Sequence, residues 1–415
     1  MSLIVQKFGG TSVGSVDRIK RVAQRISAAR AEGHGVVVIV SAMGHTTDEL
    51  LELLGQVSVK APPREVDMLL TTGEQVSVAL VATALEELGC PARSILGFQA
   101  GIETEPNHTR AAITQIRPTR LEQLVGQGVV PVVAGFQGIT PEGEITTLGR
   151  GGSDTTAVAL AAALEADMCE IYTDVDGVYT TDPRIVPEAR LLREISYEEM
   201  LELASLGAKV LHPRSVEYAK RASIFLKVRS SFSEHPGTVV KGVEQLEIRN
   251  PVNGVTADLN QAKVALLEVP DKPGVAAEIF GRLAEKGINV DVISQSVHGG
   301  TIQDVAFTIA LDDLAAAREL AEAVSSEIGA KGVVTDDKVA KVSIVGAGMI
   351  NHPGTAAQMF GALAQAGINI QMISTSEIKV SCVIERSRAL EAIQIVHRKF
   401  ALHEEASQPV VLGSR

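Results

Sequence analysis

The chain has 415 residues, with 38 Lys and Arg against 50 Asp and Glu, and this length predicts two or three domains. Its net charge of −12 disfavours nucleic acid or an anionic membrane surface as the main partner. With no Trp and 3% aromatic residues the chain offers little for base stacking, whereas a hydrophobic content of 45% is enough for large α/β cores.

The same composition predicts a cytoplasmic protein. The longest apolar runs, at 36–40 and 157–164, fall far short of the roughly 20 residues of a membrane-spanning helix. The first residues lack the basic-then-apolar layout of a signal peptide, and the three cysteines have no metal-ligand spacing. We therefore expect reduced thiols in a cytoplasmic chain.

Strand and helix patterns alternate from residue 1 to about residue 240. The expected strands are 3–8, 36–40, 129–133, 170–173 and, as the last, 224–229. The expected helices are 16–31, 74–88, 155–165, 197–206 and 213–221. Such alternation is typical of a mostly parallel sheet covered by helices on both faces, which is a three-layer α/β/α domain.

The last third of the chain contains an internal repeat. Residues 273–294 align without gaps to 353–374, and 13 of the 22 positions are identical. Each copy has a strand, a Pro-Gly turn, a helix ended by a glycine, two further strands and a second helix. This order, with room for a closing strand, predicts two ferredoxin-like βαββαβ modules of about 70 residues each.

Two glycine-rich segments follow expected strands and precede helices. In the segment 7–12 (Lys-Phe-Gly-Gly-Thr-Ser), glycines before a helix suit phosphate binding, and an ordinary tight turn is the alternative. In the segment 146–156, Ser153 or Asp154 is placed to cap the following helix. Capping does not explain Arg150 among three glycines, a setting that suits a bound carboxylate or phosphate.

Three further segments are candidates for a binding site. Acidic residues over 173–184 lack the spacing of a calcium loop, so they indicate at most a nucleotide contact. Lys209 is expected in a turn between two helices, where a solvated lysine is the alternative interpretation. Glu74 is expected to open a helix, where it could simply complement the helix dipole. The Gly-Ala-Gly at 346–348 lacks the third glycine of a dinucleotide fingerprint.

Taken together, the motifs at 7–12, 41–43, 73–74, 149–154 and 173–179, with Lys209, resemble the aspartokinases of the amino-acid kinase family. The repeats resemble the two ACT domains of these enzymes. The resemblance implies a catalytic domain over 1–245, a first ACT domain over 263–337 and a second over 338–415. It leaves open that a strand from 250–262 completes the second ACT domain. The length leaves no room for a fused homoserine dehydrogenase, so the resemblance implies a monofunctional enzyme.

The resemblance implies transfer of phosphate from ATP, with Mg²⁺ held through the ATP phosphates and no metal site on the protein, to the side-chain carboxylate of L-aspartate. The product, 4-phospho-L-aspartate, opens lysine, threonine and methionine biosynthesis. The implied catalytic residues are Lys7, Asp154 and Lys209. The implied nucleotide-binding residues are Lys7, Phe8, Gly9, Gly10, Ser41, Thr173, Asp174, Tyr179, Asp182, Arg184, Lys209 and Val210. The implied substrate-binding residues are Thr47, Glu74, Arg150, Gly152, Ser153 and Asp154.

The ACT resemblance further implies feedback inhibition by lysine, threonine or both. The implied regulatory residues are Asp271, Gly274, Ala276, Asn289, Val290, Asp291 and Gln295 in the first copy, and Asn369, Ile370, Thr375, Ser376 and Glu377 in the second. Pairing of ACT domains implies a homodimer, or an α2β2 assembly with a separately translated C-terminal regulatory subunit. The alternatives are a kinase for another amino acid, such as glutamate, and a catalytically silent amino-acid sensor.

Overall fold

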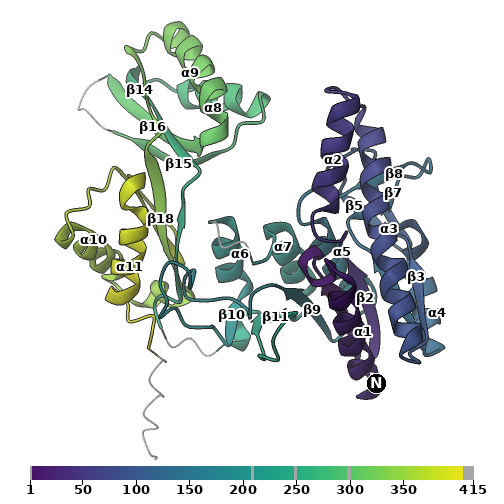
Figure 1. Ribbon diagram of the computed structural model, residues 1–415. Coiled ribbons are helices and arrows are strands. Elements are labelled where there is room, and N and C mark those ends of the chain that lie inside the picture. Colours follow the sequence, from purple (N-terminus) through teal and green to yellow (C-terminus); the bar gives the residue numbers. More distant parts are fainter. Residues whose placement is uncertain (1, 207–209, 247–249, 297–300, 405–415) are drawn as a thin grey trace, which may run out of the picture. The chain divides into compact units, whose positions relative to one another are not determined.

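The computed structural model describes residues 2–206, 210–246, 250–296 and 301–404. The chain divides into two compact units (Figure 1). The first is built from residues 2–178, 191–205 and 210–246, and the second from 179–190, 206, 250–296 and 301–404.

An eight-stranded sheet with the order β10-β12-β11-β9-β1-β2-β6-β3 forms the centre of the first unit. Every neighbouring pair is parallel except β11 and β12, so the predicted mostly parallel α/β sheet is confirmed. The strands are β1 (Leu3–Phe8), β2 (Gly35–Val40), β3 (Ala92–Ile95), β6 (Val130–Ala134), β9 (Met168–Thr173), β10 (Glu194–Ser196), β11 (Leu226–Ser230) and β12 (Thr238–Lys241). The strand expected to be the last, β11, is therefore followed by β12, which turns back beside it.

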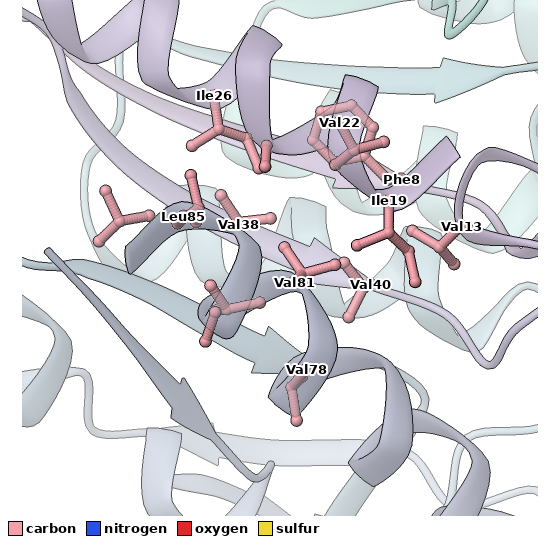
Figure 2. Packing of buried hydrophobic residues seen from close by; sticks show 14 of the residues in the cluster. Phe8, Val13, Ile19, Val22, Ile26, Val38, Val40, Val78, Val81 and Leu85 are labelled. Carbon is pink, nitrogen blue, oxygen red and sulfur yellow. The ribbon is translucent and has the colours of Figure 1, made fainter. Parts of the chain in front are cut away.

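Helices cover both faces of this sheet. They are α1 (Val16–Ala31), α2 (Thr46–Val57), α3 (Pro63–Glu87), α4 (Thr119–Gly126), α5 (Gly152–Ala163), α6 (Tyr197–Ser205) and α7 (Pro213–Ala222). Figure 2 shows Ile26 of α1 close to Leu85 of α3 and Val38 of β2, and Val22 of α1 beside Phe8 of β1. Lys7 lies next to Phe8 on β1, and because side chains alternate along a strand it points to the opposite face, where α5 packs.

Helix α3 starts at Pro63, eleven residues before its predicted start at Glu74. Two threonines and Gly73 lower the helix propensity of its first half, but burial of this half against the domain overrides that preference. Glu74 thus lies in the middle of the helix, and the interpretation that it complements a helix start is wrong. By length and composition alone α3 could cross a membrane, yet half of its most apolar window is buried inside the unit, as in a core helix.

A small sheet with the order β5-β4-β7-β8 belongs to the same unit, and its strands come between β3 and β9 in the sequence. Its strands are β4 (Ile102–Thr104), β5 (Ile113–Ile116), β7 (Gln137–Ile139) and β8 (Ile145–Thr147). The chain leaves β8 directly into the glycine-rich segment at 149–152, so this sheet sets where that segment begins.

The second unit contains two modules whose sheets have the same strand order. The first, β17-β14-β16-β15, consists of β14 (Gln261–Pro270), β15 (Val290–Gln295), β16 (Ile302–Ala310) and β17 (Gly332–Asp336), with α8 (Val275–Glu285) and α9 (Leu314–Ile328). The second, β13-β18-β20-β19, consists of β13 (Gly254–Asp258), β18 (Val339–Val345), β19 (Met372–Thr375) and β20 (Lys379–Glu385), with α10 (Thr355–Gln365) and α11 (Ala389–Lys399). β13 takes the place that β17 has in the first module, and the whole first module is inserted after it.

The two modules contact each other through matching lysines. Lys341 of the second module pairs with Asp291 of the first, and Lys263 of the first donates to Gln371 of the second. Asp291 and Gln371 occupy equivalent positions of the repeat. The apolar side chains between the modules are Val292, Val339, Met372 and Val383. The contact is therefore nearly symmetric, but only one of its two lysine interactions has an opposite charge.

Residues 179–190 connect β9 to β10 of the first unit, but they pack in the second unit. Val186 belongs to the apolar core of the second module, with Ile185 and Ala189 packed against it. Thr180 and the fully buried His397 of α11 are hydrogen-bonded at 2.9 Å. This segment thus belongs to one unit in space and lies within the other in sequence.

Candidate active site

A cleft of about 980 Å³ opens at the carboxyl ends of β1, β2 and β6. This edge is where open α/β sheets place their ligands, since loops from successive parallel strands meet there. The predicted site residues that line it are Lys7, Gly10, Ser41, Thr47, Glu74, Arg150, Gly152, Ser153 and Asp154. The structure therefore gathers residues from four separate segments of the sequence (7–10, 41–47, 74 and 150–154) into one cavity.

Lys7 and Asp154 form an ion pair across the floor of the cleft. Lys7 Nζ lies 2.5 Å from Asp154 Oδ1, and both side chains are largely buried. Helix α5 begins at Gly152, with Gly151 as its cap residue, and no side chain caps it. The expectation that Ser153 or Asp154 caps the helix is thus wrong. Asp154 lies in the first turn, beside the positive end of the helix dipole, and its partner is Lys7.

Glycines are required where β1 turns into the following helical turn. A Cβ atom on Gly10 would lie 2.8 Å from the carbonyl oxygen of Ala42, and Gly44 N donates to the Gly10 carbonyl at 3.0 Å. Gly9 N donates to the Tyr172 carbonyl of β9 at 3.3 Å. This close approach of three strand ends explains the glycine pair as a tight turn, and it also leaves the backbone open to a ligand.

Glu74 is a buried carboxyl group with only one of its two oxygens hydrogen-bonded. Its Oε1 accepts a hydrogen bond from Ala42 N at 3.0 Å, whereas Oε2 is buried without a hydrogen-bond partner. Burial raises the pKa of Glu74 to about 7. The raised pKa means that this group costs the fold stability as the pH rises from its ordinary pKa to about 7. A cation placed at Oε2 would remove that cost.

The segment carrying Arg150 is shaped by its glycines. Gly151 has a φ of +70°, and a Cβ atom there would lie 2.2 Å from His212 Cγ. Arg214 Nη1 donates to the Leu148 carbonyl at 2.8 Å, which ties the first turn of α7 to this segment. Arg150 is exposed at the mouth of the cleft. The segment is thus held at both ends while its guanidinium faces the cavity.

The predicted nucleotide residues fall into three groups. Phe8 is fully buried and stacks on Tyr172, so of Phe8 only the backbone is available to a ligand. Gly9, Thr173 and Asp174 lie at the same sheet edge, because β9 is paired with β1, and Val210 belongs to the same unit. Tyr179, Asp182 and Arg184 belong to the second unit, where Arg184 binds Asp182 and lowers the pKa of that carboxyl group. Lys209 lies outside the described residues.

The predicted regulatory residues lie on turns and edge strands of the two modules. Asp271, Gly274 and Ala276 surround the turn between β14 and α8, and Asn289 precedes Val290, Asp291 and Gln295 of β15. Asn369 and Ile370 precede β19, which ends at Thr375 before Ser376 and Glu377. Of this set, Asp291 is already engaged by Lys341.

Several cleft residues were not found from the sequence. Arg110, Arg214 and His212 line the cavity, as do Thr109 and Phe136. His212 and Arg214 lie at the start of the helix expected over 213–221, a pattern that does not mark cleft residues, and the segments around Thr109, Arg110 and Phe136 carry no motif that points to a ligand. Thr109 and Phe136 share one feature that only the structure reveals: both have a positive φ, of 69° and 71°, a conformation that side chains disfavour and that often occurs at functional sites.

The cleft is rich in cations although the chain is acidic overall. Lys7, Arg110, Arg150 and Arg214 line it, against Asp48, Glu74 and Asp154. Within the described ranges, no three His, Cys, Asp or Glu side chains are grouped to hold a metal ion. The cationic lining therefore fits an anionic ligand.

Comparisons with known proteins agree with this site. The model of the amino acid kinase family matches residues 2–230, and ACT domain models match 263–326 and 342–400. An aspartokinase of Thermus thermophilus is 53% identical over 404 residues, covering 97% of this chain and 99% of its own. An aspartokinase of Mycolicibacterium smegmatis is 50% identical over 421 residues and covers both chains completely.

The fold is also similar to solved structures. Aspartokinase III of E. coli, solved in complex with aspartate and ADP, is 27% identical and superposes with a TM-score of 0.79 over 96% of this chain and 100% of that one. Aspartate kinase from Synechocystis is 52% identical, with a TM-score of 0.55 over 98% of this chain and 71% of that one. The chain therefore belongs to the aspartokinases, the branch of the amino acid kinase family in which a kinase domain is joined to two ACT domains.

Proposed function

We propose that the protein transfers the γ-phosphoryl group of ATP to the side-chain carboxylate of L-aspartate, forming 4-phospho-L-aspartate and ADP. The observation that carries the proposal is the cleft itself. It brings together the buried carboxyl group of Glu74, whose Oε2 has no hydrogen-bond partner, the exposed guanidinium of Arg150 and the Lys7–Asp154 pair. The relative of known structure that holds aspartate and ADP supports the same substrates.

An amino acid has two charged groups that this cleft matches. We propose that Glu74 Oε2 accepts the substrate ammonium, since that oxygen is buried and without a partner. Arg150 then binds the α-carboxylate, because a guanidinium presents two parallel N–H groups to a carboxylate. Thr47, Gly152 and Ser153 line the same cavity and complete the pocket. Held at both ends, the substrate presents its side-chain carboxylate toward the phosphates.

The transfer itself needs no general base, because a carboxylate is already ionised at neutral pH. A carboxylate oxygen forms a bond to the γ-phosphorus while the bond from that phosphorus to the β,γ-bridging oxygen breaks, and ADP leaves with the electron pair. The protein must offset the negative charge brought together. Lys7, the N-terminus of α5 and, by proposal, Lys209 do this, and Asp154 holds the Lys7 ammonium in place.

Mg²⁺ is expected on the ATP phosphates, where it neutralises part of their charge when bound. The nucleotide base and ribose are assigned to Thr173, Asp174 and Val210, with Tyr179, Asp182 and Arg184 as further proposed contacts. Of these, Thr173 and Asp174 follow β9, the neighbour of β1, so they continue the sheet edge that carries Gly9 and Gly10.

We also propose that lysine, threonine or both inhibit the enzyme through the ACT modules, as befits the first step of lysine, threonine and methionine synthesis. Asp291 supports a ligand site at the contact between the modules, because a ligand that binds Asp291 must displace or share Lys341. Such differential binding is what shifts a protein between two conformations. The half-exposed Ile293 and Ile373, at equivalent repeat positions of the edge strands β15 and β19, favour pairing with a second ACT-containing chain.

A cytoplasmic location is part of the proposal. All three cysteines are buried free thiols, and burial raises the pKa of Cys90, Cys169 and Cys382, which protects them from oxidation.

Replacing Lys7 by alanine is expected to lower the turnover number at least a hundredfold, because the ammonium is lost from the phosphate site. Hydroxamate trapping of the aspartyl phosphate measures the rate. The alanine variant leaves Asp154 buried without its partner. Two controls for folding are therefore needed: the variant Lys7→Met, which keeps the side-chain volume, and a thermal unfolding scan. Near-normal turnover in a folded variant contradicts the assignment.

Replacing Arg150 by alanine is expected to raise the KM for aspartate more than tenfold and to leave the KM for ATP nearly unchanged. Because Arg150 is exposed, its replacement leaves the core intact, and steady-state kinetics in both substrates separates the two effects. An unchanged KM for aspartate contradicts the carboxylate-binding role.

The KM for aspartate is expected to rise as the pH falls below about 7, because protonation of Glu74 removes the charge that binds the substrate ammonium. Glu74→Gln keeps the acceptor for Ala42 N and is always neutral, so its KM is expected to be high and nearly independent of pH over this range. The pH dependence of kcat/KM for both proteins checks this. A Gln variant that retains the wild-type pH profile contradicts it.

Titration with lysine and threonine, each alone and both together, is expected to reduce aspartyl hydroxamate formation. Asp291→Asn should weaken the inhibition and leave the uninhibited rate within about twofold, because Asp291 lies in the ACT unit. Methionine and alanine serve as control ligands. Complete indifference to both lysine and threonine contradicts the regulatory proposal.

A further inference from the structure

Asp67 is a fully buried carboxylate in the first half of α3, and the assigned function does not use it. Its exposed fraction is 0%. Its oxygens accept from Thr147 Oγ1 at 2.6 Å and from Thr109 N at 3.0 and 3.1 Å, and they bond His108 Nδ1 at 2.8 Å. No lysine or arginine among the described residues pairs with it. A buried acid held only by such donors costs the fold free energy unless every bond is kept.

The backbone at Thr109 explains why these bonds are worth keeping. Thr109 has a φ of 69°, in the left-handed region, a conformation that strains a β-branched residue. Both oxygens of Asp67 approach the N–H of this residue. A charge-assisted hydrogen bond of this kind is worth about as much as the strain. Asp67 therefore stabilises a turn that the sequence of 107–110 would not adopt by itself.

This turn is part of the wall of the cleft. A Cβ atom on Gly149 would lie 3.1 Å from the Thr109 carbonyl and 3.8 Å from Arg110 Cα, so the turn packs on the segment that carries Arg150. Ala111 N donates to the Thr147 carbonyl at 2.9 Å, which joins the same two segments again. Asp67 thus connects three walls of the cavity: α3, the turn at 107–110 and the end of β8.

The turn presents Arg110 to the cavity. Arg110 is exposed and lines the cleft, and its guanidinium makes no ion pair or side-chain hydrogen bond with the described residues. Arg110 packs against Gly149, the residue that precedes Arg150, which is assigned to the substrate carboxylate. An arginine that is fixed at its backbone and whose guanidinium has no partner among the described residues is suited to an anionic ligand.

We propose that Asp67 is a positioning residue that holds the Thr109–Arg110 turn against the segment 147–150, and that Arg110 is a second guanidinium contact for a carboxylate of the amino-acid substrate. The inference rests on the proposed function, because it assigns Arg110 to the substrate of that reaction. It adds a residue pair that acts on substrate affinity through backbone placement.

The test compares Asp67→Asn with wild type in steady-state kinetics and thermal unfolding. The Asn amide replaces one acceptor oxygen by an NH₂ group, so the turn loses part of the hydrogen bonding that Asp67 gives it and is expected to shift. The KM for aspartate should rise at least tenfold, while the KM for ATP stays within threefold. Adding Thr109→Gly should recover most of the affinity, since glycine adopts this φ without strain and no longer needs Asp67.

Arg110 carries a separate arm of the test. Arg110→Ala, at an exposed position, should raise the KM for aspartate at least fivefold, and Arg110→Lys should recover only part of the loss. Arg120→Ala, an exposed arginine on α4 outside the cleft, is the matched control and should change neither KM. Because Arg110→Ala leaves the core intact, this measurement tests the contact between Arg110 and the substrate even if Asp67→Asn does not fold.

The outcomes separate the two proposals. Wild-type turnover of aspartate with an unchanged KM in Asp67→Asn and Arg110→Ala overturns the positioning role alone. Equal increases in both KM values, or a lower melting temperature without rescue by Thr109→Gly, also overturn it and indicate a purely structural residue. Absence of wild-type turnover with aspartate overturns the proposed function and this inference with it.

Discussion

The ion pair between Lys7 and Asp154 is the interaction on which the architecture of the cleft depends. It ties the end of the central strand β1 to the first turn of α5, so that a cation, a helix N-terminus and the glycine turn at Gly9 and Gly10 face one space. A reaction between two anions needs positive charge that is already in position, because reorienting solvent or side chains during the reaction is costly. The buried pair fixes that charge before any ligand arrives.

Helix α3 adds two buried carboxyl groups that differ in their surroundings. Asp67 and Glu74 are seven residues apart, so they lie on the same side of the helix. Asp67 receives hydrogen bonds at both oxygens, and such a group is a structural anchor. Glu74 receives one and keeps a buried oxygen without a partner. The two carboxyl groups therefore differ in how many donors the surrounding chain supplies, and we propose that the first serves the scaffold and the second a ligand.

Much of this could be predicted from sequence, and the failures have physical causes. Period and glycine position locate β1, α1 and the repeated modules, because local patterns there agree with the tertiary fold. The first half of α3 was missed, because burial overrides its weak propensity. The cap assigned to Asp154 was wrong, because its partner, Lys7, lies 147 residues away in sequence. Arg110 was missed for the same reason: only long-range contacts place it at the cleft.

The excursion of residues 179–190 into the second unit has a consequence for dissecting the protein. Ile185, Val186 and Ala189 are apolar and find their packing partners in the second module, and His397 supplies the bond to Thr180. A recombinant fragment that ends near residue 246 would lose those partners, and its segment 179–190 would expose apolar side chains to solvent. A boundary drawn from the linear sequence would thus yield a product that exposes apolar side chains and is prone to aggregate, because the first unit contributes one segment of its sequence to the core of the second.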